Sequence, residues 1–515
     1  MRVFNVLRNS IYSLASLFLV GILTFAVRKC FVLYLPLELL GVEGLFSNIL
    51  NMLSLAEMGV SSVIGYGLYR ELAHKNEKEI NVLMNIYRSI YAMIGVVVGI
   101  IGVILFFCLP WIVRHANVDW FYVQFVFVIQ IGTALSSYFL AYRRTLFAAD
   151  QKDFLSVRVD IFCSLASNAV KLCAIIFLHS YLLYAAVGLV FNVLANLIIS
   201  HRVKVAYPFL HHVRVTWEEM RQRRFFTDIG NFLVHKICYV VYGTDMVIAS
   251  SILGLRITAL LANYALVQES VYKIMYKALQ GIIPSIGNLI HEEDSKKVYL
   301  VFRMLDMIYS FIGSYTACIY MIVLQPFITL FFGAEYLLPT SYVITVAINV
   351  FLGMQFENVY NFRSTYGYYE RDRSYMILSA LAKLVLSIIL SYKYGVTGIM
   401  IGTIIGFLFV AYGRIYIVFR FILKRPILPY LFHHLWNSTL VALEIALVTW
   451  VMSYLSLPTS YVGLIVSCIL AVILMGVVQV LIFHRTEEFQ ALFVYAHSGV
   501  QALKARLHHV FHSKE

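Results

Sequence analysis

RRTLFAAD, at residues 143–150, returns in a weaker form as RSTYGYYE at residues 363–370. An arginine, a threonine and an acidic residue keep the same spacing in both stretches, 220 positions apart. Other pairs repeat at nearly the same interval, namely Arg88 and Arg303, Pro110 and Pro326, and the dipeptides Leu40-Gly41 and Leu253-Gly254. Similarity at a fixed interval constrains the whole fold, so we interpret the second half of the chain as a degenerate copy of the first.

The composition is that of a protein embedded in a membrane. Of its 515 residues, 61% are hydrophobic and only 13% are charged, and the mean hydropathy is +0.81. About fourteen stretches are apolar over roughly 20 residues, the length of a helix that crosses a hydrocarbon core ~30 Å thick. The sequence therefore predicts an all-α polytopic membrane protein with about fourteen transmembrane helices.

The order of these stretches predicts the domain organisation. We expect two six-helix bundles related by pseudo-twofold symmetry, followed by two peripheral helices. An even number of crossings in each bundle would place the symmetry axis along the membrane normal. The predicted ranges are an N-terminal bundle at 1–206, a cytoplasmic connector at 207–224, a C-terminal bundle at 225–425, two additional transmembrane helices at 426–484 and a cytoplasmic amphipathic tail at 485–515.

Basic residues set the predicted orientation. Most lysines and arginines fall in loops on one side of the membrane, and these include Arg143, Arg363 and Arg414. The other side holds only Arg114, Arg256 and Lys393. By the positive-inside rule, both termini are expected in the cytoplasm. The net charge of +13 then reflects contact with the anionic membrane surface, and no nucleic-acid partner is expected.

Charged residues within the predicted helices are the candidate functional residues, because charge in a bilayer is costly. Glu269, Lys273 and Lys277 follow one another at four-residue spacing and so share one helical face. Glu269 can pair with Lys273, whereas Lys277 either contacts an anionic substrate, pairs with Asp245 or Asp306, or snorkels to the inner interface. The full set comprises the cations Arg28, Lys29, Lys171, Lys236, Lys273, Lys277 and Lys383 and the anions Glu57, Asp245, Glu269, Asp306, Glu357 and Glu444.

Motifs of enzymes are missing from the sequence. It contains no phosphate-binding Gly-Lys-Ser/Thr loop, no metal-spaced His/Glu motif and no nucleophile elbow. The pair His433-His434 falls in a basic segment and is expected at the membrane interface. We therefore predict no catalytic site, no metal site and no cofactor. Repeated halves inside a membrane instead favour a transporter whose binding site lies between them.

Several stretches resemble one family of transporters. LGVEGLFSNILNMLSLAEMGVSSVIGYGLYRE at residues 40–71, LMNIYR at 83–88, RTLFAADQKD at 144–153 and PSIGNL at 284–289 resemble the Wzx-type polysaccharide repeat-unit flippases. These belong to the multidrug/oligosaccharidyl-lipid/polysaccharide exporter superfamily. The resemblance implies two six-helix bundles that face each other in a V, with two peripheral helices, and a mechanism of alternating access.

The resemblance also implies a cargo. Such flippases move an undecaprenyl-diphosphate-linked oligosaccharide from the cytoplasmic to the outer leaflet of the bacterial cytoplasmic membrane, during assembly of capsule, O-antigen or exopolysaccharide. Membrane lipid and a polysaccharide polymerase are the other candidate partners. Basic side chains suit the diphosphate, and carboxylates suit a coupling proton or sodium ion, or pair charges. The candidates are Arg28, Lys236, Lys273 and Lys277 for the substrate, and Glu57, Asp245, Glu269, Asp306 and Glu357 for coupling or charge pairing.

Other functions stay open on the sequence alone. A lipid II flippase or a drug exporter would share the fold, although an exporter of organic cations would favour carboxylates over buried lysines. A membrane polysaccharide polymerase or ligase would need catalytic groups on a sizeable outer loop. The predicted outer loops are short and poor in charge.

Overall fold

Helices account for the regular structure of the part of the chain that the computed structural model describes, residues 2–54, 67–72, 74–113, 119–213, 225–279, 295–455 and 458–492. Ten of the described helices are long and apolar enough to cross a membrane, or eleven if the bent pair Val234–Tyr242 and Asp245–Leu253 is one span. The predicted all-α polytopic membrane protein is confirmed.

The difference from about fourteen predicted spans has identifiable sources. Two predicted spans run into residues 55–66 and 280–294, which lie outside the described residues. A third source is Tyr369–Leu423, a continuous stretch of 55 residues that contains two helices joined at Gly395, where φ is 57°. This single stretch therefore covers two of the predicted crossings.

The chain divides into two compact units. Unit 1 comprises Met1–Val271 with Ala380–Thr403, and unit 2 comprises Tyr272–Ser379 with Ile404–Glu515. Residues 214–224 of the predicted connector and 493–515 of the predicted tail lie outside the described residues. The bundle limits drawn from the sequence stay a prediction.

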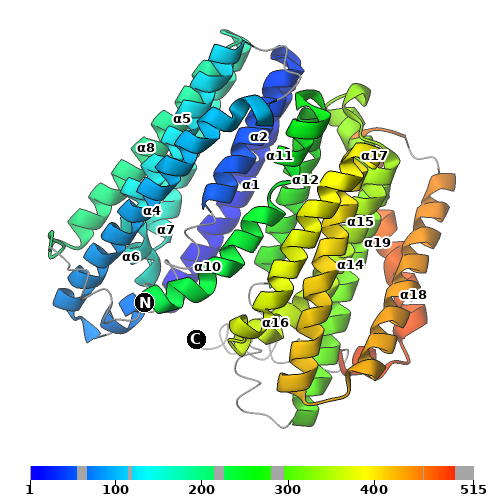
Figure 1. Cartoon of the computed structure of the whole chain (residues 1–515). Helices are drawn as coiled ribbons and strands as arrows, with labels where there is room; N and C mark the ends of the chain where they lie inside the picture. Colours follow the sequence, from blue (N-terminus) through cyan, green and yellow to red (C-terminus); the bar gives the residue numbers. More distant parts are fainter. Residues whose placement is uncertain are drawn as a thin grey trace, which may run out of the picture. The chain divides into compact units, whose positions relative to one another are not determined.

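Unit 1 contains the first-half helices and part of the second half. Asn76, Asp119 and Ser180 begin α4, α5 and α8, and each side chain accepts a hydrogen bond from a backbone N–H of the first turn, as N-capping residues do. In Figure 1, α4, α5 and α8 run side by side. The helices are α1 (Arg2–Tyr34), α2 (Leu37–Ser54), α4 (Glu77–Ile112), α5 (Trp120–Leu140), α6 (Arg144–Ala149), α7 (Phe154–Ile176), α8 (Tyr181–Ala206), α10 (Phe225–Tyr242), α11 (Asp245–Ile248) and most of α12 (Leu255–Leu279).

The repeated Leu-Gly dipeptides lie where helices approach closely inside unit 1. A Cβ atom at Gly41 of α2 would lie 2.3 Å from the carbonyl oxygen of Leu255, and one at Gly44 would lie 2.5 Å from the Cβ of Ala262. Gly254 precedes α12 with φ at 89°, a conformation that favours glycine. Glycine in both dipeptides thus has a structural reason, close approach in one and backbone conformation in the other.

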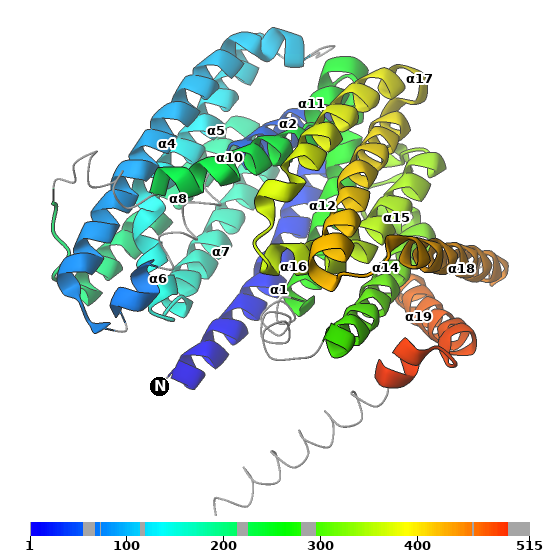
Figure 2. The same ribbon diagram turned by 60° about the horizontal axis from the view of Figure 1, so that its bottom comes forward.

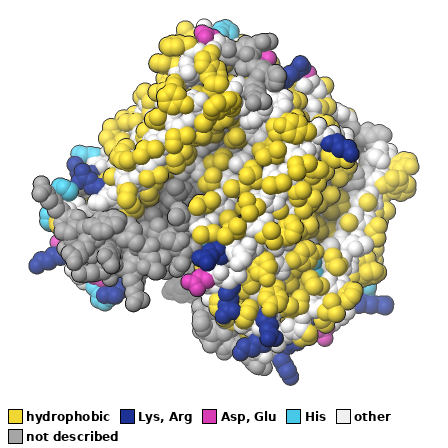
Figure 3. All heavy atoms as spheres, in the orientation of Figure 1, with side chains coloured by type: hydrophobic (Ala, Val, Ile, Leu, Met, Phe, Trp, Pro, Cys, Tyr) yellow, Lys and Arg dark blue, Asp and Glu magenta, His cyan; other side chains and the backbone are white. Residues whose placement is uncertain are grey.

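Unit 2 is built around α14 (Ser295–Phe331), which packs against α15 (Thr340–Gln355), α18 (Ile427–Tyr454) and α19 (Tyr461–Phe483). Figure 2 shows α18 and α19 next to α14. The short α16 (Glu357–Thr365) and both ends of α17 (Tyr369–Ile417) complete the unit. Hydrophobic side chains dominate the face seen in Figure 3, as expected for helices in contact with lipid.

Helices α4 and α14 support the interpretation of the chain as a duplication. Each carries one of the repeated prolines near its C-terminal end, Pro110 in α4 and Pro326 in α14. The two helices are also nearly equal in length, with 36 and 37 residues. The spacing read from the sequence thus corresponds to matching elements.

Candidate functional site

The first copy of the repeated element stabilises helix ends within unit 1. Arg143 donates a hydrogen bond of 2.7 Å to the hydroxyl of Ser200. Asp150 accepts one of 2.6 Å from the Tyr207 hydroxyl and forms an ion pair of 2.6 Å with Lys152. Burial and the contact with Asp150 raise the pKa of the Tyr207 hydroxyl above its ordinary value. These residues therefore brace α6 and α8.

The second copy forms a buried charge cluster in unit 2. Asp372, which has no exposed surface, accepts Arg363 at 3.1 Å and Arg414 at 2.8 Å on one carboxylate oxygen. The sequence predicted both arginines in loops, whereas the structure buries them on α16 and α17. Their predicted cytoplasmic side stays a prediction. The carboxylate of Asp372 is what makes their burial tolerable. The charge of Arg414 also acts on Glu357, which begins α16.

Arg28, a substrate-binding candidate, has an acidic partner in unit 1. Its guanidinium lies 2.9 Å from the carboxylate of Glu43, and the two side chains are 14% and 11% exposed. Lys171 lies over the ring of Tyr184 at 4.6 Å, and the charge of Glu43 acts on it. Arg28 is thus paired with Glu43, whereas Lys171 contacts an aromatic ring and has no ion pair within 4.0 Å among the described residues. Glu43 was not among the predicted functional residues, although it belongs to the LGVEG stretch that carries the resemblance.

A second charged pair lies at a break in a membrane-spanning helix. The axes of α10 and α11 differ by 45° across the break. Lys383, fully buried, lies 2.6 Å from the carboxylate of Asp245 and donates to the Thr244 hydroxyl at 2.8 Å and the Val241 carbonyl at 3.1 Å. A helix break leaves backbone groups without their usual partners. The ammonium of Lys383 satisfies one of these groups and neutralises Asp245, a predicted coupling residue.

The remaining candidates are placed as follows. Lys236 is half-buried on α10 of unit 1. Glu269 and Lys273 are exposed on α12, and the boundary between the units falls between them, after Val271. Lys277 belongs to α12, but its side chain lies outside the described residues, as does Glu57. The proposed cation set spans both units and stays a prediction.

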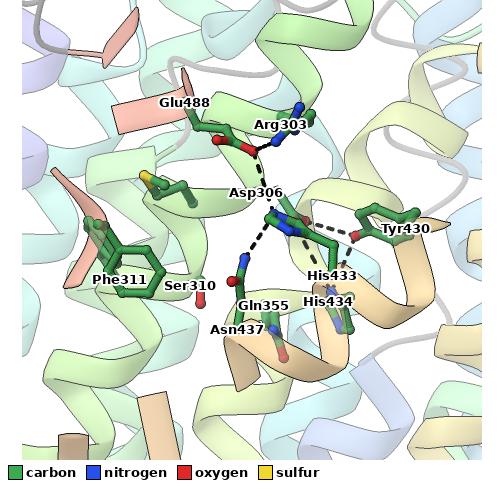
Figure 4. Close-up of a pocket in the computed structure, with 12 residues that line it drawn as sticks. Arg303, Asp306, Ser310, Phe311, Gln355, Tyr430, His433, His434, Asn437 and Glu488 are labelled. Carbon is green, nitrogen blue, oxygen red and sulfur yellow. Dashed lines mark hydrogen bonds and ion pairs between the residues drawn. The ribbon is translucent and has the colours of Figure 1, made fainter. Parts of the chain in front are cut away.

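Asp306 belongs to a polar pocket in unit 2 (Figure 4). Its carboxylate accepts a hydrogen bond of 3.1 Å from the Tyr430 hydroxyl and lies 3.9 Å from Nδ1 of His434. The enclosed volume is about 20 Å³, room for a single water. His434 is only 2% exposed, so protein atoms surround it, and its predicted place at the membrane interface stays a prediction. The carboxylate and the hydroxyl provide polar partners that compensate its burial.

Glu488 closes the same pocket from the segment after α19. Its side chain is 2% exposed and is ion-paired with Arg303 of α14, and His433 Nε2 of α18 lies 3.5 Å away. Burial alone raises the pKa of the Glu488 carboxyl, but the contact with His433 and the charge of Arg303 outweigh it and hold the pKa below its ordinary value. Glu488 therefore fastens the end of α19 to α14 and α18.

Neither family models nor curated proteins match the chain, but solved structures do. A lipid II flippase, MurJ, in an inward closed conformation superposes with a TM-score of 0.69 at 12% identity, covering 92% of this chain and 99% of that one. This chain and the lipid II flippase share a fold. A multidrug resistance MATE family transporter of the MOP superfamily matches in an inward-facing conformation with a TM-score of 0.55 at 15% identity, over 80% of this chain and 98% of the other.

This chain is thus similar in fold to a lipid II flippase and to a MATE family transporter. An outward-facing MATE structure also matches, with a TM-score of 0.50 at 14% identity, over 80% of this chain and 95% of the other. At such identities the likeness establishes the fold, and fold alone does not specify cargo.

Proposed function

We propose that this chain is a lipid-linked oligosaccharide flippase. It moves an undecaprenyl-diphosphate-linked polysaccharide repeat unit from the cytoplasmic to the outer leaflet of a bacterial cytoplasmic membrane by alternating access. The supporting observation is the extent of the match with the lipid II flippase. Because α18 begins at Ile427, a match over 92% of the chain must extend into α18 and α19, whereas one over 80% need not.

Charge supports an anionic cargo. In unit 1, Arg28 is paired with Glu43, Lys171 lies over the ring of Tyr184, and Lys236 of α10 is half-buried. We assign Arg28, Lys236, Lys273 and Lys277 to the diphosphate, which prefers several basic donors. A cavity for organic cations would instead carry an excess of carboxylates.

The pair of Asp245 and Lys383 supports ion coupling in this mechanism. A proton or a sodium ion on Asp245 would replace the ammonium of Lys383, and Lys383 would then lose its contact at the break between α10 and α11. Broken helices with charged groups are common places for ion binding in transporters. We therefore place coupling at Asp245, with Glu57, Glu269, Asp306 and Glu357 as the other candidates.

A flipping assay tests this function. The full chain is reconstituted in proteoliposomes with a fluorescent undecaprenyl-diphosphate oligosaccharide, and the protected fraction of the label is followed over time. We expect Lys273→Ala/Lys277→Ala to slow flipping at least tenfold, because two phosphate contacts are lost. Lys296→Ala, at an exposed position on α14, should flip at the wild-type rate.

If Lys273→Ala/Lys277→Ala flips the lipid as fast as the wild type, the assignment of these lysines to the diphosphate is wrong. The same assay tests ion coupling separately. Collapsing the proton and sodium gradients should slow lipid flipping by the wild-type protein. An unchanged rate without gradients would remove Asp245 as the coupling residue.

A lipid II flippase is the second candidate, because the match with such a protein covers 99% of its chain. Lipid II also presents a polyprenyl diphosphate with a sugar. Running the assay with lipid II in place of the oligosaccharide lipid separates the two, since the true cargo should be flipped faster.

A further inference from the structure

Unit 2 contains a second, smaller pocket of about 10 Å³ that combines tyrosines with an amide and a carboxylate. It is separate from the pocket around Asp306, and it is formed by the end of α12, the middle of α14 and the junction of α15 and α16. Its lining includes Tyr272, Tyr276, Tyr309, Met354, Glu357 and Asn361. None of the motifs in the sequence marked this combination.

Two tyrosines form a flat aromatic surface in this pocket. Tyr272 and Tyr276 lie one turn apart on α12, with ring centroids 6.1 Å apart and planes inclined by only 19°. They are 52% and 45% exposed. Aromatic rings with a polar tip suit ligands that have one apolar face and polar edges. A pyranose ring is such a ligand, because its C–H groups lie on its faces and its hydroxyls on its rim.

Asn361 supplies an unused hydrogen-bonding atom beside this surface. Its side chain is 1% exposed, and its Nδ2 donates to the Tyr309 hydroxyl at 2.9 Å. Within the described residues, its Oδ1 is buried and accepts no hydrogen bond. A buried acceptor without a donor costs roughly 1–3 kcal/mol. A ligand hydroxyl would satisfy it once the Asn361 side chain turns toward the tyrosines, because the atom has less than 1 Å² of accessible surface here.

Glu357 lies one helical turn before Asn361, on the same face of α16. Among the described residues it has no ion pair within 4.0 Å. A carboxylate in a membrane-spanning helix faces water or a polar ligand, because lipid contact is costly. A carboxylate and an amide on one face can together accept and donate hydrogen bonds to neighbouring hydroxyls.

The balance of charge decides which part of a cargo fits. The carboxylate of Glu357 repels a diphosphate. An organic cation is weakly attracted, because the nearby cluster of two arginines with Asp372 offsets the charge of Glu357. An uncharged group rich in hydroxyls is not repelled by Glu357, and its binding does not depend on a net negative charge.

We propose that the exposed rings of Tyr272 and Tyr276, at the mouth of this small pocket and beside Glu357 and Asn361, are a subsite on which a sugar ring of the transported lipid lies. This inference rests on the proposed flippase function and deepens it. It assigns Glu357 to the cargo rather than to the coupling ion. The tyrosines stack on the ring, and Glu357 and Asn361 bind its hydroxyls.

The test compares lipids with and without sugar. The full chain in nanodiscs is titrated with undecaprenyl diphosphate and with the same lipid carrying glucose, galactose or N-acetylglucosamine. The wild type should bind at least one glycosylated lipid about tenfold more tightly than the bare diphosphate, as expected for one stacked ring. Tyr272→Ala/Tyr276→Ala and Glu357→Gln should each remove this gain, and the tyrosine variant should leave the affinity for the bare lipid unchanged.

Tyr392→Ala/Tyr394→Ala is the matched control, because both tyrosines are exposed but lie elsewhere on α17. It should keep the full gain. Three results overturn the subsite: no gain with any sugar, a gain that survives in the tyrosine variant, or an equal loss of both lipids. The protein is also titrated with tetraphenylphosphonium, an organic cation. If the wild type binds this cation, Glu357→Gln abolishes that binding, and no sugar increases lipid affinity, the site is one for organic cations.

The two proposals fail differently in this experiment. A wild-type protein that binds none of the diphosphate lipids contradicts the flippase function itself. A protein that binds the bare diphosphate but gains nothing from sugar contradicts only the subsite.

Discussion

Lys383 shows what a buried ammonium requires in this protein. It has no exposed surface, and three oxygen atoms surround it at 2.6 to 3.1 Å. Removing one partner of such a pair leaves the other charge uncompensated, which typically costs about 3–5 kcal/mol. We expect Lys383→Met to lower the melting temperature of the detergent-solubilised protein markedly, as followed by size-exclusion chromatography after heating.

Two further variants make the test of Lys383 specific. Lys393→Met, on an exposed position of the same helix, should melt like the wild type. Adding Asp245→Asn to Lys383→Met should recover part of the loss, because the remaining charge is then gone. Equal melting temperatures for Lys383→Met and the wild type would show that the ion pair does not stabilise the fold.

Glu488 gives a residue-level prediction about pH. Its folded-state pKa lies below the ordinary value, so its ion pair stabilises the protein fully above the unfolded pKa of about 4.3. That contribution is lost as the pH falls through the lower folded pKa. The wild type should therefore melt above Glu488→Gln at pH 7, and the difference should shrink below about pH 4.

Glu487→Gln is the natural control for this pH series. Glu487 also approaches Arg303, at 3.4 Å, but is 80% exposed, and exposed ion pairs contribute little. A melting difference between wild type and Glu488→Gln that is constant from pH 7 to pH 3 would contradict the prediction.

Buried charged residues were easier to predict from the sequence than the residues of opposite charge that pair with them. Charges inside apolar stretches identified Arg28, Asp245 and Lys383 because a bilayer makes them conspicuous. Glu43 and Asp372 escaped notice, since each lies near the end of a predicted span where charge is ordinary. Pairing depends on which helices meet in space, and a single sequence carries no direct signal of that.

At the scale of helices, the hairpin within α17 depends on glycine. Its two arms meet at Gly398 and Gly402, where an added Cβ would lie 2.1 Å from the Leu390 carbonyl oxygen and 2.4 Å from the Ser387 backbone nitrogen. Small residues four apart allow helix backbones in membranes to approach this closely. Separate spans were predicted here, but not their direct contact across a turn at Gly395.

Gly402→Ala tests the close contact of the hairpin arms. The added methyl group collides with backbone, which cannot yield as a flexible side chain would, so we expect a loss of about 1–3 kcal/mol. The melting temperature should fall accordingly. Gly353→Ala provides the control, because nothing lies within 4 Å of a Cβ at that position. Equal melting of the two variants would contradict the tight packing.

At the scale of the whole molecule, the predicted orientation makes a direct prediction. Lys393 and Lys204 are both exposed, and the charge pattern places them on opposite sides of the membrane. In a variant whose seven cysteines are replaced, Lys393→Cys should react with an impermeant maleimide in intact cells. Lys204→Cys should react only after permeabilisation. Labelling of Lys204→Cys in intact cells would reverse the topology.

The fold of the whole chain was predictable to a large extent. Apolar length and the repeated Arg-x-Thr element indicated membrane-spanning, duplicated halves, and α4 and α14 with Pro110 and Pro326 bear out the correspondence. The grouping of Ala380–Thr403 with unit 1 was not predictable. Within this unit Lys383 is buried beside Asp245, a contact between residues far apart in the chain.

That grouping has a consequence for biosynthesis. Asp245 leaves the ribosome 138 residues ahead of Lys383, an interval of roughly 7 to 28 seconds at typical rates of synthesis. During this time the nascent segment around α10 and α11 carries an acid whose permanent counter-ion does not yet exist. Insertion of this segment must therefore proceed with Asp245 protonated or held at the lipid surface, and unit 1 reaches its final packing only when the hairpin at 380–403 arrives.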